Sequence, residues 1–161
     1  MRKLLLLAGL LATGCGREEG RPQNESRAAA PAAGTPVQTA TLTGLYESAS
    51  TPPSQLCITE QGRAARFGLV IRRNGRPGCS GAGTATSDGT ALRLTMTGDS
   101  ACAIDARLEG GRVTFPPSLP PGCSYYCAPG IVMGSSQFDK TGGTAQDAAR
   151  ARDAVGDRLC A

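Results

Sequence analysis

The segment RFGLVIRRNGR, residues 66–76, indicates the fold class of this chain. Phe67, Leu69 and Ile71 recur at every second position, and arginines flank the run on the alternate phase. A period of two is typical of a β-strand with one face buried and the other in water. The Asn-Gly pair that follows favours a two-residue hairpin turn, because both of its residues accept positive φ. The segment therefore predicts a strand that leads into an antiparallel hairpin.

The same period of two continues on both sides of this hairpin. Turns that contain Pro-Pro, Asp-Gly, Gly-Asp or Gly-Gly separate further alternating segments, which lie at 42–47, 55–59, 83–86, 91–96, 102–109 and 112–115. Short strands at this spacing predict a mainly β fold, a small antiparallel meander that forms a sandwich or an open barrel. Pro77 and Gly78 make the strand after the hairpin ragged, so regular pairing near Cys79 is not expected.

After Phe115 the pattern changes. The proline-rich segment 116–121 is expected to run extended, because prolines cannot donate to a strand ladder. A further strand is predicted over 131–138. Thr144 and Asp147 then form a capping-box pattern, which predicts one short C-terminal helix over 145–155, with Gly156 at its end. Its small inner stripe is expected to pack closely on the sheet; the stripe consists of Ala148, Ala151 and Val155.

The N-terminus has the features of an export signal. Met1-Arg2-Lys3 precedes an apolar run from Leu4 to Leu11, which is shorter than the roughly 20 residues that span a bilayer. The run ends in Leu11-Ala12-Thr13-Gly14-Cys15, which resembles the lipobox of bacterial lipoproteins. The resemblance implies cleavage after residue 14 and a lipid on Cys15 that anchors the chain to the membrane. It also implies the outer membrane, facing the periplasm, because Gly16 rather than aspartate follows the cysteine.

Composition divides the remainder of the chain in two. Residues 15–40 contain Gly, Pro, Ala, Glu and Arg, with no aromatic residue and almost no large aliphatic one. Such a segment cannot bury enough apolar surface to fold, so it is predicted to be a disordered tether. Residues 41–161 are predicted to form one β-rich domain.

The domain contains six cysteines once Cys15 is assigned to lipid: Cys57, Cys79, Cys102, Cys123, Cys127 and Cys160. An even number in an exported chain predicts disulfides. Their pairing does not follow from sequence alone; linkage of neighbours in chain order would give Cys57–Cys79, Cys102–Cys123 and Cys127–Cys160. Because the chain has three Phe, three Tyr and no Trp, we expect these bridges to compensate for a thin core.

Charge offers one candidate surface. The chain has 17 basic and 13 acidic residues, and removal of Arg2 and Lys3 with the signal peptide leaves +2 (15 minus 13). This balance does not favour nucleic acid as a partner. Five arginines nevertheless occur within fourteen residues that contain no acid. They are Arg63, Arg66, Arg72, Arg73 and Arg76. They form either a solvated hairpin or a patch for lipid phosphates or an acidic partner.

Catalytic motifs are scarce. The chain has no histidine, which removes the usual general base and the commonest metal ligand. No cofactor or metal site is expected. Asp105 and Glu109 could form the carboxylate pair of a hydrolase, but both alternate outward on their strand beside Arg107 and Arg112. We therefore do not expect an enzyme.

The segment GCSYYC, residues 122–127, is the second candidate surface. Its three-residue spacer disfavours a catalytic dithiol, so its cysteines are expected to staple a loop. Tyr125 and Tyr126 either bury and bond their hydroxyls or form an exposed aromatic step for a glycan or protein partner. The favoured function is a non-enzymatic binding module at the cell envelope. The alternatives are a structural accessory that contacts lipid headgroups or an acidic partner through the Arg63–Arg76 hairpin, and a carboxylate-based hydrolase.

Overall fold

The computed structural model describes residues 41–62 and 64–160. The signal peptide, Cys15, the tether and Arg63 lie outside the described residues. The domain has eight strands, a 3₁₀ helix and a short α-helix. These elements are β1 (Gly44–Glu47), β2 (Gln55–Gln61), β3 (Ala64–Arg73), β4 (Arg76–Asp88), β5 (Ala91–Met96), β6 (Ala103–Glu109), β7 (Arg112–Thr114), η1 (Pro121–Tyr126), β8 (Gln137–Gly142) and α1 (Ala145–Ala148).

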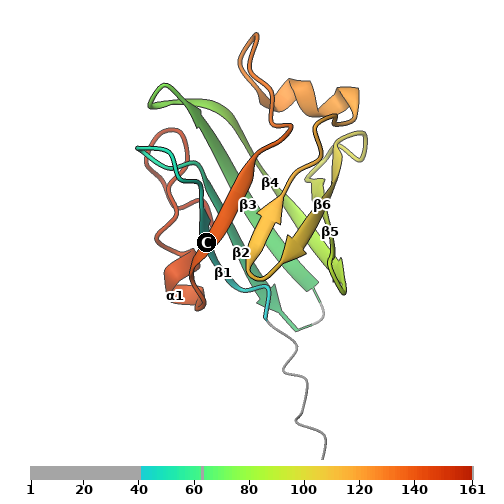
Figure 1. Cartoon of the computed structure of the whole chain (residues 1–161), viewed down its shortest axis with the longest axis vertical. Coiled ribbons are helices and arrows are strands. Elements are labelled where there is room, and N and C mark those ends of the chain that lie inside the picture. Colours follow the sequence, from blue (N-terminus) through green and yellow to red (C-terminus); the bar gives the residue numbers. More distant parts are fainter. Residues whose placement is uncertain (1–40, 63, 161) are drawn as a thin grey trace, which may run out of the picture. The chain divides into compact units, whose positions relative to one another are not determined.

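The eight strands form a closed antiparallel barrel (Figure 1). Each strand pairs with its neighbour in sequence, and β1 pairs with β8 to close the sheet. The expectation of a mainly β, antiparallel, disulfide-stapled meander with one short C-terminal helix is confirmed. Closure was not predicted; it removes the two open edges that a sandwich or an open barrel would have to protect.

Alternating apolar side chains fill the inside of the barrel. On β3, the predicted face of Phe67, Leu69 and Ile71 points inward and is buried. Phe115 and Phe138 meet near one end, with ring centroids 5.4 Å apart. A barrel of eight strands is just wide enough for side chains to fill it. Surface available to a partner therefore lies at the ends and on the outside of this barrel.

A second apolar cluster lies on the outer face of β1 and β2. Leu45 and Cys57 face outward there and are covered by the C-terminal residues 145–160, which we call the strap. Ala148 and Ala151 are buried in this contact, as their pattern predicted. On the neighbouring β3, Gly68 permits the close approach of the strap, since a Cβ there would lie 2.5 Å from the carbonyl oxygen of Leu159.

The helix is shorter than predicted. The capping box is present, with the backbone N–H of Asp147 bonded to Oγ1 of Thr144 at 3.1 Å. However, α1 ends at Ala148, and the prediction of helix to residue 155 was wrong. The carboxylate of Asp153 accepts the backbone N–H groups of residues 155, 156 and 157, which stabilises a turn in place of the helix. Val155, expected on the inner stripe, is 82% exposed.

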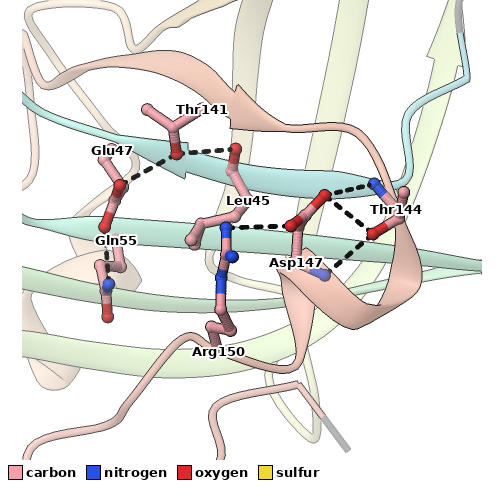
Figure 2. Close-up of polar contacts among 7 residues, drawn as sticks. All are labelled: Leu45, Glu47, Gln55, Thr141, Thr144, Asp147 and Arg150. Carbon is pink, nitrogen blue, oxygen red and sulfur yellow. Dashed lines mark hydrogen bonds and ion pairs between the residues drawn. The ribbon is translucent and has the colours of Figure 1, made fainter.

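Figure 2 shows polar contacts that join β1, β2 and β8 on the same side, and the capping box of α1 beside them. Glu47 accepts hydrogen bonds from Gln55 Nε2 at 2.8 Å and from Thr141 Oγ1 at 2.9 Å. Gln55 Oε1 in turn accepts the backbone N–H of Arg152 at 3.0 Å. This network links β1, β2, β8 and the strap, so we interpret it as structural. In the described part of the chain, no helix is long and apolar enough to cross a membrane.

The strand after the Asn-Gly turn is continuous through the Pro-Gly pair, but its pairing is irregular there, as expected. The turn itself is as predicted, with positive φ at Asn74 and Gly75. β4 then continues from Arg76 to Asp88, and Cys79 pairs with Ile71. The ladder tolerates the Pro-Gly pair because a register shift beside Ile71 leaves Gly78 as an extra residue, a β-bulge.

The last strand was misplaced. β8 covers Gln137–Gly142 rather than 131–138. Ile131 and Met133 gave the segment an apolar alternation, but they pack on the end of the core from a loop. That loop cannot extend into a ladder, because Ser135 has a φ of 59° and Gly134 lies directly against the carbonyl of Pro117.

All six domain cysteines form disulfides. The bridge Cys102–Cys123 is as predicted. The pairs Cys57–Cys79 and Cys127–Cys160 were wrong; the structure has Cys57–Cys160 and Cys79–Cys127. Chain order failed because Cys57 faces outward toward the strap, whereas Cys79 lies at the end of the barrel beside the loop that carries Cys127.

Candidate functional site

The connection between β7 and β8, residues 115–136, covers one end of the barrel, the upper end in Figure 1. It contains η1 and the loop that follows it. Two disulfides hold η1 in place: Cys79–Cys127 ties it to β4, and Cys102–Cys123 ties it to the residue before β6. The Cα atoms of these pairs are 4.0 and 4.6 Å apart. This connection is therefore attached at both ends of its helical segment.

Local sequence explains why η1 forms there. Pro120 and Pro121 supply a fixed φ at the start of the helix, where no N–H is needed. The backbone N–H of Cys123 donates to the carbonyl of Pro120 at 2.9 Å. At the other end, Ala128 N donates to the carbonyl of the bulge residue Gly78 at 2.7 Å. The bulge that interrupts the β3–β4 ladder thus provides an anchor for the η1 loop.

The two tyrosines of GCSYYC have different environments. Tyr125 is 87% exposed, which fits the exposed aromatic step. Tyr126 is half-buried and packs against the core beside Gly81. Only Tyr125 therefore presents a whole aromatic face to a partner.

Three adjoining depressions surround the Cys79–Cys127 disulfide, and we call them together the rim surface. The first is an apolar groove of about 300 Å³ between the proline-rich segment 117–121 and residues 131–134. The second, of about 340 Å³, lies between residues 77–80 and the two tyrosines. The third, of about 510 Å³, lies between the tip of the β3–β4 hairpin and residues 128–131. They are contiguous because Cys127, Gly78 and Ile131 each line two of them.

The hairpin arginines separate into two places. Arg73 and Arg76 are exposed and line the third depression. Arg72 is half-buried at the same end, where its Nη2 lies 3.5 Å from the carbonyl oxygen of Asp153. Arg66 is not part of this group, since it pairs in register with Thr59 and Thr84 nearer the other end of the barrel. The structure thus brings the tip of the arginine hairpin beside residues 128–131, in the loop that follows Tyr125.

The carboxylates proposed for a hydrolase lie elsewhere. Asp105 and Glu109 are exposed on β6, and each is bound by its own arginine. Arg93 Nη1 lies 2.6 Å from Asp105, and Arg107 contacts Glu109. Glu109 lines a hollow that does not include Asp105. This arrangement does not supply an acid and a base that face a common space, so it does not support a hydrolase at this pair.

Metal ligands are likewise not gathered. Within residues 41–62 and 64–160, no cluster of three or more cysteine or acidic side chains could hold a metal ion. The six cysteines of this part of the chain are used in disulfides.

Some residues of the rim surface were not expected from the sequence. Val132 is 68% exposed, and Leu119 and Met133 line the apolar groove. The segment 131–138 was assigned to a strand because of its alternation. The signal that could have corrected this is the Pro129-Gly130 pair, which with the prolines at 116–121 makes a loop more favourable than a strand. Comparison with protein-family models, curated proteins and solved structures finds no match to this chain.

Proposed function

We propose that the protein is a non-enzymatic binding module of the bacterial cell envelope and that the rim surface contacts its partner. The envelope location rests on the resemblance of residues 11–15 to a lipobox, with lipid on Cys15. The binding role rests on the geometry of the rim.

The observation that carries the proposal is the exposure of large apolar side chains on a covalently held loop. Tyr125 and Val132 are 87% and 68% exposed; Val132 lines the apolar groove, and Tyr125 lines the second depression, which adjoins that groove at Cys127. Scattered exposed side chains need no explanation, but a rimmed apolar depression on a monomer is typical of an interaction site. Because two disulfides hold η1 in place, a partner would bind without ordering the loop first, which reduces the entropic cost of association.

The place where the chain enters the domain supports the same role. Thr41, where the described domain begins, lies at the end of the barrel opposite to η1, as the register of β1, β2 and β3 requires. A chain attached through Cys15 would join the domain at this opposite end. The chain therefore enters the domain away from the rim surface and leaves that surface free to contact a partner. Because the rim combines an apolar groove with arginines, we favour a binding module over a headgroup-contacting accessory.

Photocross-linking tests this proposal in the full-length chain within the cells that make it. A photoreactive phenylalanine analogue at position 125 or 132 should give a discrete cross-linked product, and unmodified chain in excess should compete it away. The matched control is the same analogue at Thr86, which is exposed on β4 far from the rim. A Cys15→Ser chain should leave the membrane fraction. Products that are identical at all three positions, or absent from both rim positions, would contradict the proposed binding surface.

A further inference from the structure

The arginines of the described surface differ in their partners. Outside the rim surface, four ion pairs join an arginine to a carboxylate: Arg93–Asp105, Arg107–Glu109, Arg112–Asp139 and Arg150–Asp147. At the tip of the β3–β4 hairpin, the arginines have no carboxylate partner among residues 41–62 and 64–160. β3 and β4 contain no acidic residue before Asp88. Arg66, Arg152 and Arg158 also lack a carboxylate partner in the described part of the chain, but only at the hairpin tip do two such exposed arginines, Arg73 and Arg76, line one depression of the rim surface.

The side chains at the tip keep their donors available. Arg73 Nη2 contacts the carbonyl oxygen of Val132 at 3.5 Å, the outer limit of a hydrogen bond. A guanidinium has five N–H donors in a planar fork, which suits a carboxylate. One long contact to a carbonyl leaves most of these donors of Arg73 for a ligand. The same contact holds the guanidinium over the boundary between the third depression and the loop that lines the apolar groove.

The lining of the rim combines apolar and uncharged polar residues and contains no opposing charge. No acidic residue lines any of its three depressions. The groove between Leu119 and Val132 has the size of one or two side chains, at about 300 Å³. Ile131 lines both this groove and the hollow that contains Arg73 and Arg76. A ligand in contact with both would need an apolar group next to anionic groups.

We propose that the rim surface binds an acidic polypeptide segment. An aliphatic or aromatic side chain of the segment occupies the groove beside Val132, and its flanking Asp or Glu carboxylates pair with Arg73 and Arg76. Tyr125 covers the adjoining hollow and contacts the backbone of the segment. This inference rests on the proposed function, since it assigns a partner class to the same surface. Aromatic and arginine side chains beside an apolar pocket are the residues that dominate protein–protein interfaces.

An anionic lipid layer is a less suitable partner. It would offer phosphates to the arginines but nothing for the apolar groove at its side. The combination of groove, aromatic side chain and unpaired arginines favours a polypeptide.

Selection from a random peptide library on the full-length, oxidised chain tests the inference. We expect the selected peptides to combine Asp or Glu with a neighbouring large apolar residue. The dissociation constant of the best peptide, measured by fluorescence anisotropy, should rise roughly tenfold or more for the double variant R73S/R76S, because the charge-assisted hydrogen bonds to both carboxylates would be lost. Its affinity for the unaltered chain should fall as salt is added.

The control variant is R93S/R107S, which removes the same charge from two exposed arginines on β5 and β6. Its affinity for the peptide should stay within about twofold, since these charges lie away from the rim and are screened. Urea unfolding of both variants checks that the barrel is intact. Vesicles containing anionic lipid form a parallel arm, and binding to them is expected to be weak and indifferent to R73S/R76S.

The outcomes separate the two proposals. Peptides without acidic residues, or acidic peptides that bind R73S/R76S and R93S/R107S equally well, would overturn the inference. The proposed function would still stand after either result, provided that the photoreactive analogue at position 125 cross-links a partner in cells. Strong vesicle binding that R73S/R76S abolishes, with no peptide selected, would replace the polypeptide by lipid headgroups. Failure of cross-linking at both rim positions would remove the binding surface itself.

Discussion

At the scale of single residues, Gly68 marks the place where the strap comes closest to the barrel. A Cβ at this position would lie 2.5 Å from the carbonyl oxygen of Leu159 and 2.7 Å from its Cγ. We therefore expect Gly68→Ala to displace the strap and to lower the free energy of unfolding by about 1–3 kcal/mol, the usual cost of overpacking. Urea denaturation measures this change, and the Cys57–Cys160 bridge should be reduced faster.

Gly143→Ala is the matched control for this substitution. The nearest side-chain atom to a Cβ there is 4.0 Å away, and the residue is exposed. Its effect should be within about 0.5 kcal/mol. Equal stability of the two variants would mean that the strap moves aside without cost, contrary to the packing described above.

At the scale of elements, the three disulfides have separable roles. Cys79–Cys127 closes a separation of 48 residues and holds the η1 loop to β4, whereas Cys57–Cys160 closes 103 residues and holds the strap. Loss of either bridge should cost about 2–5 kcal/mol, with the longer closure costing more. The double variant C79S/C127S should in addition weaken rim binding, because Tyr125 and the apolar groove depend on the position of η1.

The comparison with C57S/C160S makes this prediction specific. That variant loses stability but keeps both η1 bridges, so peptide binding and cross-linking at position 125 should persist. Urea midpoints give the stability of each variant, and anisotropy gives the binding. Retention of full affinity in C79S/C127S would show that the loop keeps its shape without the bridge.

At the scale of the whole molecule, several carboxylates make the domain sensitive to acid. Hydrogen bonds from the side chain and backbone of Thr144 lower the pKa of Asp147, and backbone N–H groups, that of Val155 foremost, lower the pKa of Asp153. The hydroxyl of Thr41 has the largest lowering effect on the pKa of Glu60. The pKa of Asp139 is lowered as well, chiefly by its hydrogen bond with Arg112.

A carboxyl whose folded pKa is lowered releases its proton more readily in the folded state than in the unfolded one. Its contribution to stability is therefore present above the ordinary pKa of about 4 and is lost as the pH falls through the folded value. We expect the urea midpoint to be constant from neutral pH down to about pH 5 and to fall below it. The double variant D147N/D153N should be less stable at neutral pH and should lose less on acidification; an unchanged slope would contradict this assignment.

Much of the fold was predictable because its determinants are local. The alternation of Phe67, Leu69 and Ile71, the Asn74-Gly75 turn and the Thr144 cap act over a few residues, and each has its predicted structure. The candidate site was predictable only in parts. Tyr125 and the hairpin arginines were identified as two separate surfaces, and the apolar groove beside Val132 was assigned to a strand, because loop packing on the end of a barrel has no sequence period.

By itself the sequence determined most of the strands, most of their turns and the lipobox resemblance, since these depend on side-chain alternation and neighbouring residues. Only the tertiary structure decided the pairing of Cys57 with Cys160 and of Cys79 with Cys127, and the closure of β1 on β8. It also brought Arg73 beside the loop that follows Tyr125, although about fifty residues separate the two in the chain. These contacts join residues that are distant in sequence, and their free energy depends on how the barrel closes rather than on any segment alone.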